Sequence, residues 1–300
     1  MKKNTNQKAF SLIEISMVIL VIGILIAGIS QGIDLYDDYR LTSARNLTKN
    51  SQVNRIPDLE MWLETTSENS LATGTSSFTD KPNPVDQDSI GRWNNINPNI
   101  LPSARNHATQ NNPTALVDNQ PKYIRKGMNG LPTLLFDGTN DFFSFNGDFL
   151  VGSDYTIFVV EARSSVKFNP FLCGNQQADY KMLILGYTQN NKIFYTHYGN
   201  AINFYKDMPA FTSPIPRIHS FVFSKINGKS VYTNSGTGTS DVTLISPLIS
   251  YSGSSIGNCV NEVYYQGSIA EIITYSRALT NKERQGVETY LSKKWGIKLG

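Results

Sequence analysis

One acidic residue lies inside a long apolar stretch near the start of the sequence. Glu14 is the single charged residue between Phe10 and Ser30, where the chain reads FSLIEISMVILVIGILIAGIS. An acid near the centre of a bilayer costs about 2.5–3.5 kcal/mol on insertion scales, so it usually marks a function. The segment around Glu14 is therefore the first candidate for chemistry.

The element that carries Glu14 is predicted to be a membrane-spanning helix over about residues 12–30. About 20 residues, each rising ~1.5 Å along a helix, match the ~30 Å of hydrocarbon in a bilayer. Residues 1–9 are polar and include Lys2, Lys3 and Lys8. Lysines before a single span place that end in the cytoplasm, so the rest of the chain is expected on the far side of the membrane.

Ordinary leader types explain this segment less well. A secretory signal peptide needs small residues in an A-x-A-like pattern, and large apolar residues occupy the required positions between Ala27 and Ser30. There is no nearby cysteine for a lipid anchor. A plain signal anchor fits the length and the charge but gives no reason for Glu14.

The stretch from Lys8 to Glu14, KAFSLIE, resembles the prepilin peptidase site of type IV pilins and type II secretion pseudopilins. The resemblance implies cleavage between Ala9 and Phe10, N-methylation of Phe10, and an assembly contact between Glu14 and the new amine of a neighbouring subunit. A buried ion pair offsets a desolvation penalty that a lone acid would bear in full. The family usually has Gly before the cut, and Ala9 is the small alternative.

This resemblance also implies partners and a location. The partners are prepilin peptidase, other pilin or pseudopilin subunits and the lipid bilayer. The location is a bacterial inner membrane, crossed once, with a cytoplasmic N-terminus and a periplasmic or extracellular C-terminal domain, on a pilus in one alternative. The sequence leaves open whether the machinery is a pilus, a secretion system or an uptake system.

The predicted domains are a leader (1–9), a pilin-type helix (10–55) and a β-rich domain (56–300). Apolar residues continue at loosely helical spacing from Ile33 to Val53, and Pro57 is a natural stop. Beyond it, short apolar or alternating runs are separated by Gly, Asn, Ser, Thr and Pro, which is typical of a β-sandwich or jelly roll. The predicted strands are Thr133–Asp137, Asp141–Phe145, Tyr155–Ala162, Lys181–Tyr187, Lys192–His197, Ile218–Ser224, Ser230–Thr233 and Ser268–Tyr275.

Two local signals are sharper than the rest. Asn227-Gly228 between two predicted strands indicates a hairpin with a type I′ turn. Thr280 followed by Glu283 fits a capping box at the start of a terminal helix that Gly296 ends.

Segments spread over residues 55–300 resemble concanavalin A-like, laminin-G-like sandwich domains of bacterial surface and phage proteins. They include the Phe136-Asp137-Gly138 segment and the closing Lys294-Trp295-Gly296 segment. The resemblance implies a mainly β fold, a concanavalin A-like jelly roll with a C-terminal helix, preceded by the long transmembrane helix. The Asn- and Pro-rich stretch from about 66 to 130 is expected to form long loops.

Catalysis is not expected, so the chain is predicted not to be an enzyme. Glycoside hydrolysis needs two carboxylates that flank the bond, and no Glu-x-Asp-x-Glu run occurs. Glu60 and Glu64 flank Trp62, where the solvated face of an edge strand is expected. The three histidines lie near no Gly-x-Ser-x-Gly elbow, so His197 and His219 are interpreted as surface or hydrogen-bonded residues.

Binding sites are few in the sequence. Asp137, Asn140 and Asp141 offer hard oxygen ligands for calcium, although Asp and Asn also dominate ordinary turns. No other cofactor is predicted. A tyrosine-rich region invites two interpretations, a glycan-binding groove or ordinary core and edge positions, and its members are Tyr187, Tyr195, Tyr198 and Tyr205.

Cysteines and charge add two expectations. Cys173 and Cys259 form no C-x-x-C motif, and outside the cytoplasm they either make one disulfide or remain two buried thiols. The net charge is +3, with 17% charged residues, and no Lys/Arg cluster appears in the folded part. Nucleic-acid binding is therefore not expected.

These observations favour a pilin-like or pseudopilin-like structural subunit that displays a β-sandwich head, adhesive in one version. The alternative is a membrane-anchored carbohydrate-binding module that assembles no filament and binds a glycan or another surface ligand. A glycan hydrolase is the weaker alternative.

Overall fold

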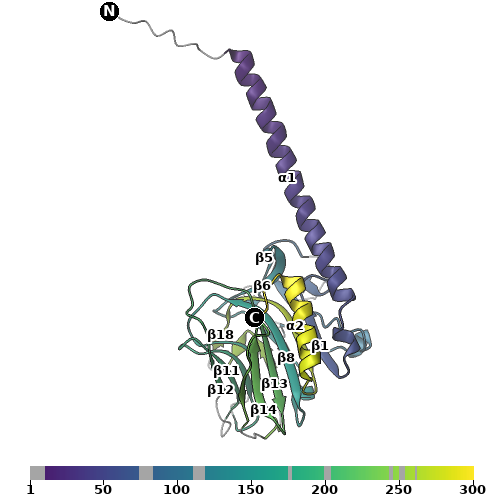
Figure 1. Ribbon diagram of the computed structural model, residues 1–300, viewed down its shortest axis with the longest axis vertical. Helices are drawn as coiled ribbons and strands as arrows, with labels where there is room; N and C mark the ends of the chain where they lie inside the picture. The colour runs from purple at the N-terminus through teal and green to yellow at the C-terminus, as the bar shows by residue number, and fades with distance from the viewer. Residues whose placement is uncertain are drawn as a thin grey trace, which may run out of the picture. The chain divides into compact units, whose positions relative to one another are not determined.

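The computed structural model describes residues 11–73, 84–110, 119–174, 178–198, 204–242, 246–249, 254–260 and 262–300. The chain divides into two compact units, Met1–Thr42 and Ser43–Gly300. Figure 1 shows a long helix in the first unit and a sandwich of strands with a terminal helix in the second.

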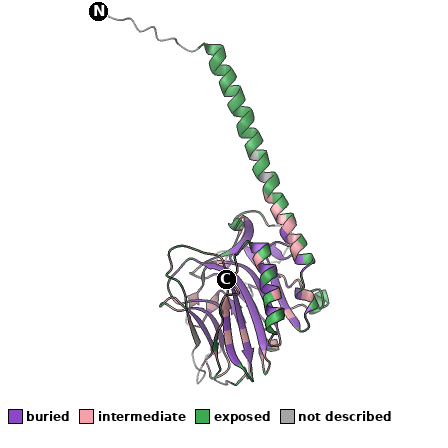
Figure 2. Cartoon of the chain, viewed as in Figure 1, coloured by how far each residue is buried: buried purple, intermediate pink, exposed green. Residues whose placement is uncertain are grey.

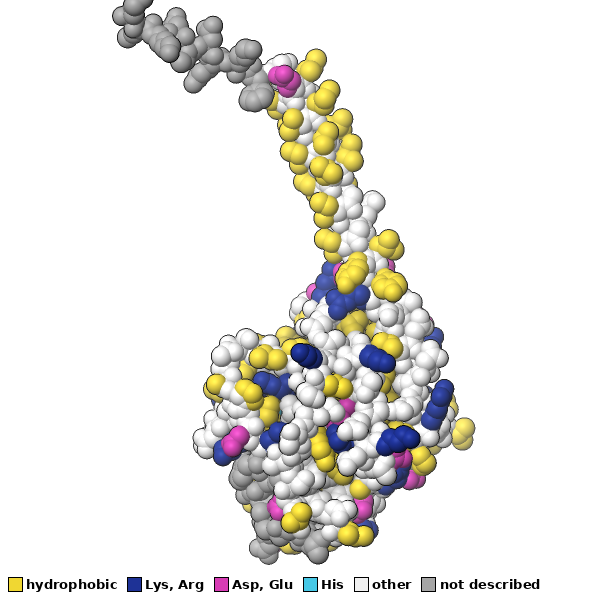
Figure 3. Space-filling view, in the orientation of Figure 1, with side chains coloured by type: hydrophobic (Ala, Val, Ile, Leu, Met, Phe, Trp, Pro, Cys, Tyr) yellow, Lys and Arg dark blue, Asp and Glu magenta, His cyan; other side chains and the backbone are white. Residues whose placement is uncertain are grey.

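Helix α1 (Leu12–Lys49) begins in the first unit and ends in the second. Its apolar side chains up to Ile33 are exposed, and Figures 2 and 3 show an exposed, hydrophobic surface along it. A helix that is hydrophobic all round requires an apolar environment. Among the described residues, α1 is the helix long and apolar enough to cross a membrane.

The helix continues past residue 30, as predicted, but it ends at Lys49 and does not reach residue 55. A short 3₁₀-helix, η1 (Val53–Arg55), follows it. Val53 and Ile56 are buried in the β domain, so the chain turns into the core before Pro57.

The first sheet contains eight described strands, which pair antiparallel. Strand β19 pairs with three of them, namely β8, β6 and β1 (Leu59–Glu64). The seven strands other than β1, in order across the sheet, are β15 (Thr239–Asp241), β14 (Gly228–Thr233), β13 (Arg217–Ser224), β8 (Tyr155–Arg163), β19 (Gln266–Tyr275), β6 (Leu131–Asp137) and β5 (Lys122–Met128).

The second sheet also pairs antiparallel. Its described strands, in order, are β12 (Phe204–Asp207), β11 (Lys192–His197), β10 (Leu183–Tyr187), β9 (Asn169–Cys173), β16 (Ser254–Ile256), β7 (Phe143–Phe145), β4 (Ala108–Thr109), β3 (Ile90–Trp93) and β2 (Leu71–Thr73). A separate hairpin joins β17 (Asn258–Cys259) and β18 (Val263–Tyr264).

Strand β8 shows how the layers are built. All nine of its residues are buried. Tyr155, Ile157 and Val159 belong to the main core, which side chains of both sheets fill. Phe158 and Val160 point to the opposite face and pack in a second core that includes residues of helix α2 (Asn281–Trp295). At β8 the first sheet is therefore covered on both faces, which explains why this strand is almost continuously apolar.

Most of the strands and helices that the sequence predicts are confirmed. Each predicted strand has a counterpart, and Lys192–His197 has the same bounds as β11. The prediction of long loops over 66–130 is wrong in part, because β2, β3, β4 and β5 lie there. The predicted β13–β14 hairpin forms. Ser224 pairs with Gly228, so residues 225–227 form the loop. Gly228 has a positive φ of +74°, but Asn227 does not have a positive φ. The turn is thus a three-residue loop and not the predicted type I′ turn.

Helix α2 has the predicted caps. The Thr280 hydroxyl accepts a hydrogen bond from the Glu283 N–H, and the Glu283 carboxylate accepts one from the Thr280 N–H. Gly296 ends the helix in the left-handed conformation, at φ 63°. These bonds satisfy backbone groups that a helix end otherwise leaves unpaired.

Candidate functional sites

The N-terminal end of α1 carries Glu14 in its first turn. The Glu14 carboxylate accepts a hydrogen bond from the Ser11 N–H at 2.8 Å, and the Ser11 hydroxyl accepts one from the Ile13 N–H at 3.3 Å. A carboxylate here also interacts favourably with the helix dipole. Glu14 can therefore stabilise the first turn of α1, in addition to making the predicted contact between subunits. Ala9 and Phe10 lie outside the described residues.

Glu64 lies in a buried cluster and not on a solvated face, so the expectation for this strand is wrong. Strand β1 turns Trp62 and Glu64 toward helix α2, where Lys294 Nζ lies 2.7 Å from Glu64 Oε2. Burial alone raises the pKa of Glu64, but the Lys294 ammonium and hydrogen bonds from Lys294, Ser67 and Thr66 outweigh it and lower the pKa to about 2. Glu60 remains partly exposed and accepts a bond from the Ser276 hydroxyl.

Glu271 is the second carboxylate of this cluster. It lies opposite Glu64 in the β1–β19 pair. Its oxygens accept hydrogen bonds from the indole N–H groups of Trp62 and Trp295, at 2.7 and 2.8 Å, and from Tyr290 at 2.8 Å. Lys294 Nζ is 2.9 Å away. Both carboxylates are fully buried and hydrogen-bonded, so this pair holds β1, β19 and α2 together.

A further buried carboxylate, Glu161, lies between the two sheets. It accepts hydrogen bonds from Tyr187 and Tyr265, both at 2.6 Å, and lies 3.0 Å from His219 Nε2. Burial lowers the pKa of His219, while hydrogen bonds from its neighbours hold the pKa of Glu161 below its usual value despite burial. Both side chains of this pair are enclosed in the core.

Of the two interpretations of the tyrosine-rich region, ordinary core positions are confirmed for two of its four residues, and these two line no groove. Tyr187 and Tyr195 are fully buried and point into the main core. Tyr195 donates a hydrogen bond to Tyr155, whose hydroxyl is 2.7 Å from His197 Nε2. Burial lowers the pKa of His197 to about 3. Tyr198 is partly exposed, and the side chain of Tyr205 lies outside the description.

The predicted calcium ligands form a hydrogen-bonded turn. Asp137 accepts from the N–H groups of Thr139 and Asn140, and Asp141 accepts from the Asp137 N–H. Burial raises the pKa of Asp141 to about 7. Among the described residues no cluster of three or more His, Cys, Asp or Glu could hold a metal ion. These bonds are those of an ordinary Asx turn, and calcium remains a prediction.

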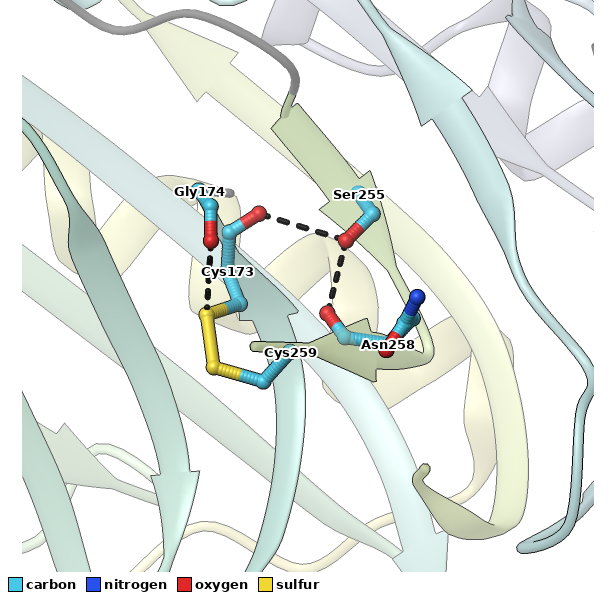
Figure 4. Close-up of a disulfide and its surroundings, with 5 residues drawn as sticks. All are labelled: Cys173, Gly174, Ser255, Asn258 and Cys259. Carbon is cyan, nitrogen blue, oxygen red and sulfur yellow. Dashed lines mark hydrogen bonds between the residues drawn. A yellow bond between two sulfur atoms is a disulfide. The ribbon is translucent and has the colours of Figure 1, made fainter. Parts of the chain in front are cut away.

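Cys173 and Cys259 form a disulfide in the structure (Figure 4). Cys173 belongs to β9 and Cys259 to β17, so the bond ties the β17–β18 hairpin to the second sheet. The Ser255 hydroxyl beside it donates to the carbonyl of Asn258 at 2.6 Å. Both sulfur atoms lie in a small apolar cluster with Met182 and Ile184, apart from the main core.

Comparison with known proteins identifies one segment. Residues 4–30 match the family model described as "Prokaryotic N-terminal methylation motif". The match contains Ala9, Phe10 and Glu14, and it supports the prepilin-type interpretation of the N-terminal segment. No curated protein matches the chain.

Solved structures resemble the β domain in fold. A GH54 α-L-arabinofuranosidase soaked with a cyclic sulfate inhibitor has a TM-score of 0.55 at 10% identity, over 84% of this chain and 65% of that one. A mutant of that enzyme soaked with 4-nitrophenyl α-L-arabinofuranoside has a TM-score of 0.56 with the same identity and coverage. Trypanosoma rangeli sialidase has a TM-score of 0.50 at 13% identity, over 79% of this chain and 33% of that one. At these identities the likeness shows the fold alone.

The expectation that the chain is not an enzyme is overturned by these likenesses. The sialidase and the arabinofuranosidase are glycosidases, so the fold is one that glycoside hydrolases use. The chain spans about a third of the sialidase and 65% of the arabinofuranosidase. These likenesses do not test the resemblance to concanavalin A-like domains, which remains a prediction.

Proposed function

We propose that this chain is a pilin-type subunit. Prepilin peptidase removes residues 1–9, Phe10 becomes the methylated N-terminus, and helix α1 anchors the mature chain in the inner membrane and then in an assembly of similar subunits. The β-sandwich is carried on the periplasmic or extracellular side. The observation that carries this proposal is the methylation motif at residues 4–30, which leads directly into the apolar helix.

Two features of the structure support this location. A disulfide is typical of proteins outside the cytoplasm, and Cys173 and Cys259 form one. The apolar part of α1 is exposed within its own unit, as expected of a segment that lipid or neighbouring helices cover. A large sandwich head also suits a minor or adhesive subunit, because such heads crowd one another in a dense filament.

Intact mass and N-terminal sequencing of the protein from membranes of its native host test the proposal. We expect a chain that begins at Phe10 and carries an N-methyl group. Ala9→Leu should block cleavage, because it places a bulky residue before the cut, and Ala9→Gly should be cleaved at least as well as the wild type. A wild-type chain that still begins at Met1 contradicts the proposal.

A second candidate function is that the sandwich acts on or binds glycans. The fold likeness to the GH54 arabinofuranosidase, at a TM-score of 0.55, favours it. Incubation of the full chain with a glycan panel would separate hydrolysis, which releases new reducing ends, from binding alone. Either activity should survive Glu14→Ala, because that substitution lies in the helix. No binding and no release across the panel would count against this candidate.

A further inference from the structure

The outer face of the second sheet carries an open pocket of about 510 Å³ beside the turn between β10 and β11. Its lining residues are Phe168, Thr188, Gln189, Asn190, Lys192 and Phe194. Along β11, Ile193 and Tyr195 belong to the main core, so Phe194 between them points to the outer face. The volume suits a ligand of about one or two sugar rings, since small-molecule sites commonly occupy about 300–1,000 Å³.

Hydrogen bonds hold the β10–β11 turn in one shape. The Asn191 N–H donates to the carbonyl of Thr188 at 3.2 Å. This bond closes a β-turn that has Gln189 and Asn190 at its corners. The Thr188 hydroxyl accepts from the N–H groups of Asn190 and Lys192, at 3.2 and 3.3 Å. The two corner residues therefore have an ordered backbone, and a ligand that binds them has less conformational entropy to remove.

A buried arginine fastens this turn to the domain. Arg163 is fully buried, and its guanidinium carbon lies 4.0 Å from the centroid of the Tyr187 ring. Arg163 donates to Asn191 Oδ1. The Asn191 amide in turn donates to the carbonyls of Met208 and Pro209, at 2.9 and 2.7 Å. The pocket is therefore built on a supported turn, as a binding site requires.

Two aromatic rings form the apolar part of the pocket. The rings of Phe168 and Phe194 meet edge to face, with 6.0 Å between their centroids. Phe168 is only half-buried, so part of its ring is open to solvent at the pocket. A pyranose ring carries C–H groups on its faces and hydroxyls around its edge. The C–H face of a sugar can therefore pack on Phe168, where it covers exposed apolar surface.

The turn supplies hydrogen-bonding groups that a ligand can reach. The side chains of Gln189 and Asn190 are exposed. Neither side-chain amide makes a hydrogen bond to the described part of the chain. Each amide offers one acceptor oxygen and two donor hydrogens. Such groups match sugar hydroxyls, which both donate and accept.

The pocket offers no unpaired charge to an ionic ligand. Lys192 is the one charged residue among the described residues that line it, and its Nζ lies 3.0 Å from Asp207 Oδ1. Both side chains are exposed to water, so this ion pair contributes little to stability. It does balance the ammonium charge, and the pocket therefore favours a neutral ligand.

We propose that this pocket binds a neutral pyranose saccharide, with a C–H face of one ring on Phe168 and hydroxyls on the amides of Gln189 and Asn190. The inference rests on the second candidate function, a glycan-directed sandwich, and does not depend on prepilin processing. It places the saccharide on the outer face of the second sheet, whereas helix α2 packs on the first sheet.

The test is calorimetric titration of the full chain with the neutral trisaccharides cellotriose, xylotriose and β-1,4-galactotriose. The detergent is lauryldimethylamine oxide, because the sugar headgroup of a maltoside would compete. We expect at least one of the trisaccharides to bind with roughly millimolar affinity, equally well at low and high salt. Trigalacturonate is the acidic comparison ligand. No binding of any neutral trisaccharide, or tighter binding of trigalacturonate, overturns the proposal.

Variants locate the site. Phe168→Ala should weaken binding roughly tenfold through loss of the stacked ring. The double variant Gln189→Ala/Asn190→Ala should weaken it by a similar factor, because two hydrogen bonds are lost. Phe142→Ala and Asn227→Ala are the matched controls, since both residues lie outside the pocket and neither is buried. If Phe168→Ala lowers the melting temperature, the double variant decides, because both of its residues are exposed in a turn.

The remaining outcomes are distinguishable. Binding that depends on Phe168 but not on the two amides identifies an apolar pocket and overturns the saccharide assignment. Glycan binding that neither pocket variant weakens keeps the second candidate function and overturns only this site. Intact mass, measured on protein from native membranes, tests processing separately. Binding by a chain that begins at Met1 contradicts only the pilin proposal.

Discussion

Glu64, Lys294 and Glu271 place two negative charges and one positive charge where the side chains are fully buried. The excess negative charge is stabilised by neutral donors, chiefly the indole N–H groups of Trp62 and Trp295. Buried ion pairs often contribute little net stability, but removing one partner is costly because the other is left without its counter-charge. The cluster is therefore a sensitive point of the domain.

Lys294→Met should destabilise the β domain by about 3–5 kcal/mol, because it leaves both glutamates buried without a cation. Lys293→Met is the matched control, as its side chain is exposed on the same helix, and it should change the free energy of unfolding by less than about 0.5 kcal/mol. Urea unfolding followed by tryptophan fluorescence measures both. Similar midpoints for the two variants would show that the charged cluster does not stabilise the fold.

The same cluster sets an acid limit for stability. Glu64 has its pKa lowered from 4.5 to about 2 in the fold. Its contribution is then complete above pH 4.5 and is lost as the pH falls through 2, and it amounts to about 3 kcal/mol. We expect Glu64→Gln to flatten the decline of unfolding free energy over that pH range. Parallel pH profiles for the variant and the wild type would contradict this assignment.

Glu14 has one hydrogen bond in the structure and one proposed role in assembly, and a pair of substitutions separates the two. Glu14→Ala removes both the bond to the Ser11 N–H and the proposed contact with the amine of a neighbouring subunit. Glu14→Gln keeps an acceptor for the Ser11 N–H but removes the charge. We expect both variants to insert in the membrane and neither to enter the polymer, as measured by sheared-filament or cross-linking assays. Incorporation of Glu14→Gln at the wild-type level would assign Glu14 to helix capping alone.

Residues whose partners lie nearby in sequence could be predicted, and residues with distant partners could not. Thr280 and Glu283 are three positions apart, and the capping box was read directly from them. Glu64 was expected on a solvated face because its partner Lys294 lies 230 residues away. For Tyr187 and Tyr195 the sequence left a groove and the core as alternatives for the same reason, since the opposite sheet that buries them is remote in sequence.

At the scale of elements, the disulfide fastens the β17–β18 hairpin to β9. The hairpin has only two residues in each described strand, and a short two-stranded unit is marginal alone. The cross-link spans 86 residues of sequence, so it restricts the unfolded chain considerably.

Replacing both cysteines with alanine should lower the free energy of unfolding by about 4 kcal/mol on the loop-entropy estimate. Thermal unfolding with and without a reducing agent measures the effect. The wild-type melting temperature should fall in the reductant, while that of the Cys173→Ala/Cys259→Ala variant should not change. A wild-type protein that unfolds identically in both conditions would show that the cross-link contributes nothing.

Elements with strong apolar patterns were predictable, and short polar ones were not. Strand β8 reads as a strand because all its residues except Glu161 and Arg163 are apolar, aromatic or β-branched, and shorter apolar runs inside β13 and β19 give the same signal. Strands β2, β3 and β4 have two to four residues each, and they lie among Asn and Pro residues that favour turns. Their pairing depends on neighbours in the sheet and not on local composition.

For the whole molecule, the class of fold could be predicted but the strand order could not. Many short strands with turn signals indicate a sandwich. The order β15-β14-β13-β8-β19-β6-β5 depends on pairings between distant segments, which no local pattern specifies. The pocket at the β10–β11 turn was missed on the same ground, since Phe168 meets this turn only in the folded domain.

The pairing of β1 with β19 has a consequence for the order of events during biosynthesis. Strand β1 is among the first parts of the domain to emerge, and its described pairing partner is among the last. The two carboxylates and the lysine that join β1, β19 and α2 meet only when residue 294 has arrived. Formation of non-local contacts is slow. The β domain therefore completes this part of its fold only when almost the entire chain is available, which under the proposed function is after export, with the apolar helix already in the bilayer.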